Sequence, residues 1–261
     1  MPAKEFASTA LISPFVSATA EVDGAGNNAI AANPASADQS QDAQSLDEQA
    51  PHAQSLDKQS PHAQALGGKA PLRLGVMASG SGSNFEAIAA AIANGTLNAQ
   101  IVLLIYNNPG AKVLARANRL GIPSLLLDHR KFDSREALDD AIVAALKGAD
   151  VNWVVMAGWM RRVTQRLISA FPNRILNIHP SLLPSFPGVR AVEQALAAGV
   201  KIAGCSVHHV ELVVDSGPIV MQAAVPVLPD DTVERLQARI QVQEHRIFPM
   251  AIAIAAGHFA E

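Results

Sequence analysis

A loop of small residues at positions 78–84, reading Ala-Ser-Gly-Ser-Gly-Ser-Asn, is the first segment suited to bind a ligand. It precedes residues 85–93, whose apolar spacing predicts a helix. Glycines let the backbone approach a ligand closely, and a helix N-terminus presents unpaired N–H groups to an anion. Phe85 stands where a dinucleotide fingerprint needs its third glycine, and the loop lacks the lysine of a nucleoside-triphosphate loop. We therefore predict a phosphate-monoester site; the alternative is a tight turn in which Ser83 or Asn84 only caps the helix.

Residues 176–188, Leu-Asn-Ile-His-Pro-Ser-Leu-Leu-Pro-Ser-Phe-Pro-Gly, place an amide and an imidazole at alternate positions. Asn177 and His179 point the same way if this segment is extended. Such a pair can stabilise an oxyanion and transfer a proton. An Asn-x-His pair alone is more often structural, but the three prolines that follow make this one more specific.

Asp215 lies within residues 213–218, Val-Val-Asp-Ser-Gly-Pro, where the simplest interpretation is a turn residue. The functional interpretation pairs its carboxylate with His179 and so favours the protonated imidazole. His208 and His209 lie on a predicted strand, whose alternation turns only one of them toward the core. A zinc site built from these residues lacks any His-x-x-x-His or Glu-x-x-His spacing, and we expect no metal.

Gln241, Glu244 and His245 share one face of a predicted C-terminal helix because of their three- and four-residue spacing. From the residue pattern alone, a solvated helix face is the preferred interpretation.

Alternating strands and helices must position these residues. The predicted strands are 72–77, 101–105, 123–127, 151–156 and 174–176, and the predicted helices are 85–93, 111–120 and 134–146, the last capped by Asp133 or Ser134. Two extended segments follow at 202–210 and 218–227, and then a helix at 231–256 that Pro249 should kink. The alternation predicts a mostly parallel α/β sheet with right-handed crossovers and two appended strands.

The composition narrows the class of protein. The chain has 261 residues, of which 49% are hydrophobic and 16% charged, with a net charge of -3. This allows a sizeable core and argues against a basic nucleic-acid-binding protein. The single cysteine, Cys205, excludes an intramolecular disulfide. Because no apolar run approaches the roughly 18 residues of a membrane span and no secretory signal is convincing, we expect a cytoplasmic protein.

Residues 1–70 repeat a short pattern at a ten-residue step, Ala-Gln-Ser-Leu-Asp at 43–47 and 53–57, with a shorter copy at 63–66. A decamer with one leucine cannot bury enough apolar surface to offset the entropy lost on ordering. We therefore predict a disordered extension at residues 1–70 and a folded domain at residues 71–261. His52 and His62 recur at the same step, and a solvated linker explains them better than a metal site.

Six segments, in this order and spacing, resemble the phosphoribosylglycinamide formyltransferases over about residues 72–257. They are residues 79–84, 132–135 (Phe-Asp-Ser-Arg), 157–161 (Ala-Gly-Trp-Met-Arg), 177–184, 215–218 and 243–245 (Gln-Glu-His). The Asn-x-His-Pro-Ser-Leu-Leu-Pro and Asp-x-Gly-Pro segments mark the wider formyltransferase group. The glycine-serine loop and the Gln-Glu-His helix narrow the resemblance to this family.

The resemblance implies a Rossmann-like, mostly parallel sheet with helices on both faces, and a direct formyl transfer in purine biosynthesis. The donor would be 10-formyltetrahydrofolate and the acceptor the amine of 5′-phosphoribosylglycinamide. No metal, nucleic acid or membrane would take part, and the enzyme would be a monomer or a homodimer. Asn177 and protonated His179 would stabilise the oxyanion, His179 would assist proton transfer to the departing folate nitrogen, and Asp215 would support the histidine and a water.

The resemblance also implies binding residues. Those for the ribonucleotide are Gly82, Ser83, Asn84, Gln241 and Glu244. Those for the folate are Arg135, Met160, Arg161, Arg162, Val163, Asn177 and Glu211, with Arg135 suited to an anionic glutamate tail. The chain departs from the family pattern at residues 189–193, which replace a His-rich stretch, at Arg162-Val163, which replaces a more apolar pair, and at the less polar residues 211–214.

Other members of the formyltransferase group share this core. A methionyl-tRNA formyltransferase would carry a C-terminal RNA-binding domain, and a formyltetrahydrofolate hydrolase would carry a regulatory domain before the core; we expect neither here. A non-catalytic ligand-binding relative is the alternative of a different class. The presence of Asn177, His179 and Asp215 together argues against it.

Overall fold

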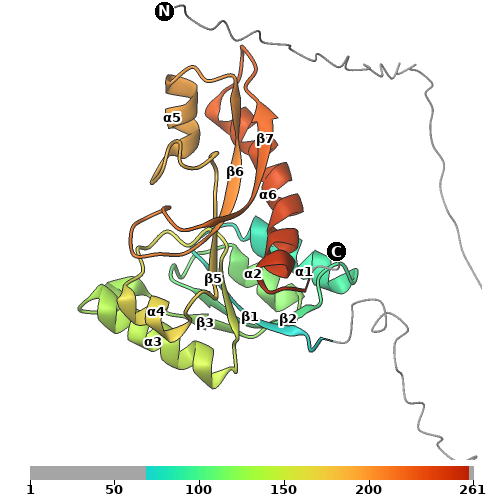
Figure 1. Ribbon diagram of the computed structural model, residues 1–261. Coiled ribbons are helices and arrows are strands. Elements are labelled where there is room, and N and C mark those ends of the chain that lie inside the picture. Colours follow the sequence, from blue (N-terminus) through green and yellow to red (C-terminus); the bar gives the residue numbers. More distant parts are fainter. Residues whose placement is uncertain (1–68, 259–261) are drawn as a thin grey trace, which may run out of the picture. The chain divides into compact units, whose positions relative to one another are not determined.

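The computed structural model describes residues 69–258 (Figure 1). The disordered extension predicted for residues 1–70 lies almost wholly outside this part of the chain, as do residues 259–261. One seven-stranded sheet forms the centre, in the order β3-β2-β1-β4-β5-β6-β7. Its strands are β1 (Leu72–Ala78), β2 (Ala99–Tyr106), β3 (Ser124–Leu126), β4 (Trp153–Met156), β5 (Ile175–His179), β6 (Ile202–His209) and β7 (Ile219–Pro226).

The sheet is parallel from β3 to β5 and antiparallel from β5 to β7. This confirms the predicted parallel α/β core with two appended strands. The chain builds β2 and β3 on one side of β1 and then crosses to place β4 on the other side. The strand order therefore reverses between β1 and β4, and in open α/β sheets ligands bind at the carboxyl ends of the strands beside such a point.

Helices cover both faces of the sheet, as Figure 1 shows. On one face, α1 (Ser83–Ala93), α2 (Val113–Arg119) and α6 (Val233–Ala255) bury side chains against the sheet, and α5 (Ala191–Ala197) joins the same hydrophobic cluster. On the other face, α3 (Arg135–Gly148) and α4 (Gln165–Ala170) form a second cluster. Because both faces are covered, β1 and β4 are apolar at nearly every position rather than at alternate ones.

Gly75 allows α3 to pack closely on β1. A Cβ atom at this position would lie 2.3 Å from a Leu146 methyl group and 3.1 Å from the side chain of Val151. The glycine thus determines how near the second helical layer lies to the strand that leads into the glycine-serine loop.

The structure differs from the predicted elements mainly at their ends. Helix α1 begins at Ser83, two residues before its predicted start, and β5 continues through His179 instead of ending at residue 176. The short helices α4 and α5 and a 3-10 turn at His129–Lys131 were not predicted, because one or two turns carry too little periodicity. Helix α6 continues past the buried Pro249 to Ala255.

Candidate active site

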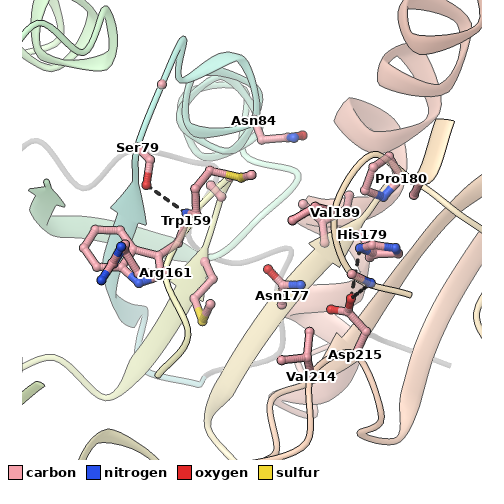
Figure 2. Close-up of a pocket in the computed structure, with 18 of the residues that line it drawn as sticks. Ser79, Asn84, Trp159, Arg161, Asn177, His179, Pro180, Val189, Val214 and Asp215 are labelled. Atoms are coloured by element: carbon pink, nitrogen blue, oxygen red, sulfur yellow. Dashed lines mark hydrogen bonds and ion pairs between the residues drawn. The ribbon is translucent and has the colours of Figure 1, made fainter. Parts of the chain in front are cut away.

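A cavity of about 660 Å³ lies at the carboxyl ends of β1, β4 and β5. The loops that follow these strands line it, together with the Asp215 loop and one face of α6. Figure 2 shows His179 and Asp215 on one wall, Ser79 and Arg161 on the opposite wall, and Asn177 between them. The predicted catalytic residues therefore lie beside the point where the strand order reverses.

The glycine-serine loop lines one end of the cavity and leads directly into α1. Gly82 is the N-cap residue, with a left-handed φ of 75°, and a Cβ atom there would lie 2.5 Å from the Val113 side chain. No side chain caps the helix, so Ser83 and Asn84 are not the simple capping residues of the alternative interpretation. The first N–H groups of α1 are thus left for an anion in the cavity.

The side chains of this loop bind helix α6. Gln241 Nε2 donates a 2.8 Å hydrogen bond to Ser83 Oγ, and Asn84 Nδ2 donates one of 2.8 Å to Glu244 Oε2. The spacing of Gln241 and Glu244 therefore turns both side chains toward the cavity, and they do not form the solvated face favoured by the residue pattern alone.

Glu244 is a buried carboxylate on the cavity wall. Burial raises its pKa, and the hydrogen bond from Asn84 opposes that rise only in part. The amide oxygen of Asn84 is also buried and has no hydrogen-bond partner in the described structure. An acidic group and a free acceptor side by side suit a ligand that brings hydroxyl or ammonium donors.

His179 lies at the end of β5 and is 5% exposed. Its Nε2 is 2.9 Å from the Phe186 carbonyl oxygen, and its Nδ1 is 3.4 Å from Asp215 Oδ2. Both ring nitrogens therefore face oxygen acceptors, the environment in which an imidazolium can donate from both sides. The predicted pairing of His179 with Asp215 is present.

Asp215 approaches the site from the loop between β6 and β7, where it has a left-handed φ of 55°. Its Oδ2 accepts a 2.8 Å hydrogen bond from the Gly188 amide, and its Oδ1 lies 3.6 Å from His208 Nε2. Burial alone would raise the pKa of this carboxyl group. The neighbouring His208, the hydrogen bond from Gly188 and the charge of His179 together outweigh burial and lower the pKa, so Asp215 is ionised at neutral pH.

His208 is a further residue of the site, and the sequence had singled it out only as one of two histidines on a strand. The antiparallel register pairs it with Asn177, and its Nε2 lies 3.1 Å from Asn177 Nδ2. The predicted alternation is confirmed, because His208 is 2% exposed while His209 is only partly buried.

The loop after β4 lines the opposite side of the cavity and includes Met160, Arg161, Arg162 and Val163. Its conformation is held at both ends: Met160 N–H donates 2.8 Å to Ser79 Oγ, and Thr164 N–H donates 2.6 Å to Asp139 Oδ2. Ser79 and Asp139 thus position a loop that lines the cavity, without any local signal in the sequence for that role.

Arg135 lies outside the main cavity. It lines an adjoining hollow of about 350 Å³, together with Arg162, Val163 and Leu212, and the last three also line the main cavity. In residues 69–258, neither Arg135 nor Arg162 forms an ion pair within 4.0 Å. The hollow thus extends the cavity with two arginines and one carboxylate, Glu136, and carries a net positive charge.

The other predicted binding residues line the main cavity: Gly82, Ser83, Asn84, Met160, Arg161, Arg162, Val163, Asn177, Glu211, Gln241 and Glu244. The structure adds Val189, Leu212 and Val214 from exposed loops that carry no distinctive motif, and the buried Val192 from the first turn of α5. That these four side chains line one cavity is visible only once the loops and α5 meet.

Residues 69–258 show neither a membrane-spanning helix nor a metal-ligand cluster. No helix there is long and apolar enough to cross a membrane, and no group of three or more His, Cys, Asp or Glu side chains is arranged to ligate a metal ion.

Comparison with known proteins agrees with this geometry. The sequence profile of the family described as Formyl transferase matches residues 72–252. The phosphoribosylglycinamide formyltransferase of Bacillus subtilis is 41% identical over 180 residues, which cover 69% of this chain and 92% of that protein. The trifunctional purine biosynthetic protein adenosine-3 of Drosophila melanogaster is 45% identical over 70% of this chain, which spans only 14% of that protein.

A solved structure supports the same relationship. The crystal structure of glycinamide ribonucleotide transformylase 1 from Symbiobacterium toebii superposes with a TM-score of 0.71 at 48% identity, covering 73% of this chain and 91% of that one. The profile match, these identities and the shared fold show that the chain belongs to the formyl transferase family, among the phosphoribosylglycinamide formyltransferases.

Proposed function

We propose that this chain transfers the formyl group of 10-formyltetrahydrofolate to the amine of 5′-phosphoribosylglycinamide, a step of purine biosynthesis. The observation that carries the proposal is the meeting of Asn177, His179 and Asp215 at one cavity whose other end is the glycine-serine loop. A phosphate-binding end and an oxyanion-stabilising end in one cavity match a phosphorylated acceptor with a reactive amine.

The ribonucleotide would enter with its phosphate at Gly82, Ser83 and Asn84. The free N–H groups at the start of α1 and the helix dipole favour a dianion there. The ribose or glycinamide group would then lie beside Glu244, which accepts hydrogen bonds from hydroxyl or amine groups. The ligand would thus give the buried Glu244 carboxylate a second hydrogen-bond donor, in addition to Asn84.

In the chemical step, the neutral amine of the acceptor attacks the formyl carbon and forms a tetrahedral species. Asn177 would donate a hydrogen bond to its oxyanion, and protonated His179 would donate a second through Nε2 after this nitrogen leaves the Phe186 carbonyl, while Asp215 stabilises the imidazolium through its 3.4 Å contact with Nδ1. The formyl carbon then separates from N10 of the folate, which receives the proton that the amine loses. His179, aided by a water near Asp215, would relay this proton.

The folate would occupy the other half of the cavity. Its pterin would contact backbone groups of residues 160–163 and the Glu211 loop, and apolar contact would come from Val163 and Leu212. The glutamate tail would extend toward Arg135 and Arg162, where the adjoining hollow presents two arginines with no carboxylate partner in residues 69–258.

The test is release of tetrahydrofolate from 10-formyltetrahydrofolate, followed by absorbance, with and without 5′-phosphoribosylglycinamide. Release that requires the ribonucleotide is the expected result. Release at the same rate without it would identify a hydrolase instead, and no release from folded protein would leave a binding protein.

A further inference from the structure

We propose that His208 is a positioning residue, which acts by fixing the orientation of the Asn177 side-chain amide. The inference rests on the proposed function, because it assigns His208 a part in formyl transfer through Asn177. Asn177, His179 and Asp215 keep the roles given to them above, and His208 lies beside Asn177 on the neighbouring strand.

The pairing of β5 with β6 brings the two side chains together. Asn177 and His208 are direct partners in the antiparallel register, and their side-chain nitrogens Nδ2 and Nε2 are 3.1 Å apart. Side chains of directly paired residues lie on the same face of a sheet. His208 is 2% exposed, so solvent does not compete for its ring nitrogens.

The other ring nitrogen determines the tautomer. His208 Nδ1 lies 2.8 Å from the carbonyl oxygen of His209, which can only accept, so Nδ1 carries a hydrogen. In the neutral ring, Nε2 then has a lone pair directed at Asn177 Nδ2. The charged group that also faces Nε2 is Asp215, whose Oδ1 at 3.6 Å is beyond normal hydrogen-bond length.

This contact makes the two ends of the Asn177 amide inequivalent. One hydrogen of Nδ2 is given to His208, and the second hydrogen on the same nitrogen is left for the formyl oxygen. Without the acceptor, the amide can turn over, because rotation about its terminal bond is soft. The amide oxygen would then face the developing oxyanion in part of the molecules and repel it.

Two substitutions separate this role from a structural one. His208→Gln can place its amide oxygen near the position of Nε2 and so keep an acceptor for Asn177 Nδ2, while it loses the Nδ1 group. His208→Asn keeps a donor near the position of Nδ1 for the His209 carbonyl but cannot reach Asn177. A positioning role and a structural role therefore predict opposite orders of activity.

The experiment measures kcat and KM for both substrates with the full chain. We expect His208→Asn to lower kcat about 10- to 100-fold with KM changed less than about threefold, the pattern of an interaction made only in the transition state. We expect His208→Gln to stay within about fivefold of the wild-type kcat. Equal losses in both variants, or the reverse order, would overturn the proposal.

A double substitution adds a second criterion. Asn177→Ala should lower kcat by about 10²- to 10³-fold, and adding His208→Asn to it should cause no further loss beyond about twofold, because His208 acts through Asn177. If the factors by which the two single substitutions lower kcat multiply in the double variant, His208 acts independently of Asn177. If wild-type protein transfers no formyl group at all, the proposed function fails first, and the two failures are thereby distinguished.

A measurement on unmodified protein covers the case in which the His208 variants do not fold. In protein labelled with ¹⁵N-asparagine, the side-chain signals of Asn177 should show one amide hydrogen protected from exchange with solvent. Their assignment comes from their absence in Asn177→Ala, or from selective broadening by a bound ligand. Rapid exchange of both hydrogens would refute a fixed amide.

Discussion

Replacing Glu244 by glutamine is expected to stabilise the unliganded protein and to weaken its binding of the ribonucleotide. The carboxylate is buried, and its one hydrogen-bond partner in the described structure is the amide of Asn84, at 2.8 Å. Glutamine has nearly the same shape and can accept the same hydrogen bond, but it brings no charge into the core. The substitution therefore removes a penalty from the folded state while keeping the packing.

The size of the effect follows from two opposing contributions. Burying an ion has an effective penalty of several kcal/mol after relaxation of the protein. The charge-assisted hydrogen bond from Asn84 returns about 1.5–3 kcal/mol. A net stabilisation of about 1–2 kcal/mol is left for Glu244→Gln, which corresponds to a rise in Tm of about 2–8 °C for a domain of this size.

The pH dependence has a definite sign. The folded-state pKa of Glu244 is raised above the usual glutamate value of 4.5, so the folded protein retains this proton to higher pH than the unfolded chain does. The wild type therefore loses stability as the pH rises from 4.5 through the folded pKa. The difference in Tm between Glu244→Gln and the wild type should be small near pH 4.5 and should grow toward pH 8.

Function should change in the opposite direction. Loss of a charged acceptor for the ribonucleotide removes about 1.5–3 kcal/mol, or a factor of about 10–100 in its KM. Thermal unfolding at pH 5 and pH 8, with and without the ribonucleotide, tests both parts, since a bound ligand raises Tm. Glu211→Gln is the control, because Glu211 is exposed on the same cavity and its neutralisation should change stability by less than about 0.5 kcal/mol. A lower Tm for Glu244→Gln at pH 8, or an unchanged KM, would refute the reasoning.

Three further substitutions test other parts of the site. Gly82→Ala should lower the free energy of unfolding by about 2–4 kcal/mol, because the added Cβ meets Val113 at 2.5 Å in a left-handed backbone. Gly80→Ala is the matched control, because a Cβ at that position would have no heavy atom within 4 Å. Equal midpoints of urea unfolding for the two variants would contradict this account. His179→Ala should lower kcat about 10²- to 10³-fold while calorimetry shows ribonucleotide affinity changed less than about threefold, so near-normal turnover would exclude the assigned role. Arg135→Ala should raise KM for a folate with several glutamates about two- to fivefold without changing kcat, and an unaltered KM would remove Arg135 from the folate site.

Much of the fold could be predicted from local patterns. The apolar runs that became β1, β2 and β4 are each buried on both faces, and the Ser134 hydroxyl caps α3 by accepting from the Ala137 amide, as a serine at that position predicts. Residues close in sequence determine these features. The strand order was less accessible, because pairing depends on contacts between residues far apart in the chain.

The site shows the same division. The sequence identified Asn177 and His179 as a pair two residues apart on one strand, and it identified the glycine-serine loop by its composition. It did not indicate that Arg135 lies in an adjoining hollow rather than in the main cavity. The residue pattern alone favoured a solvated face for Gln241 and Glu244, and only the family resemblance placed them in the site, since nothing near them in the sequence reveals that α6 packs against the start of α1.

By itself, the sequence determined the kinds of chemical group present and their local geometry: an amide beside an imidazole, a carboxylate in a turn, and a loop that ends in helix N–H groups. Only the tertiary structure decided which of these groups meet. Asp215 contacts His179 although the two lie 36 residues apart in the sequence, and His208 meets Asn177 across the antiparallel pairing of β5 with β6. The physical reason is that hydrogen bonding and backbone preference act over a few residues, whereas the packing of whole elements around a shared core determines the distances between loops.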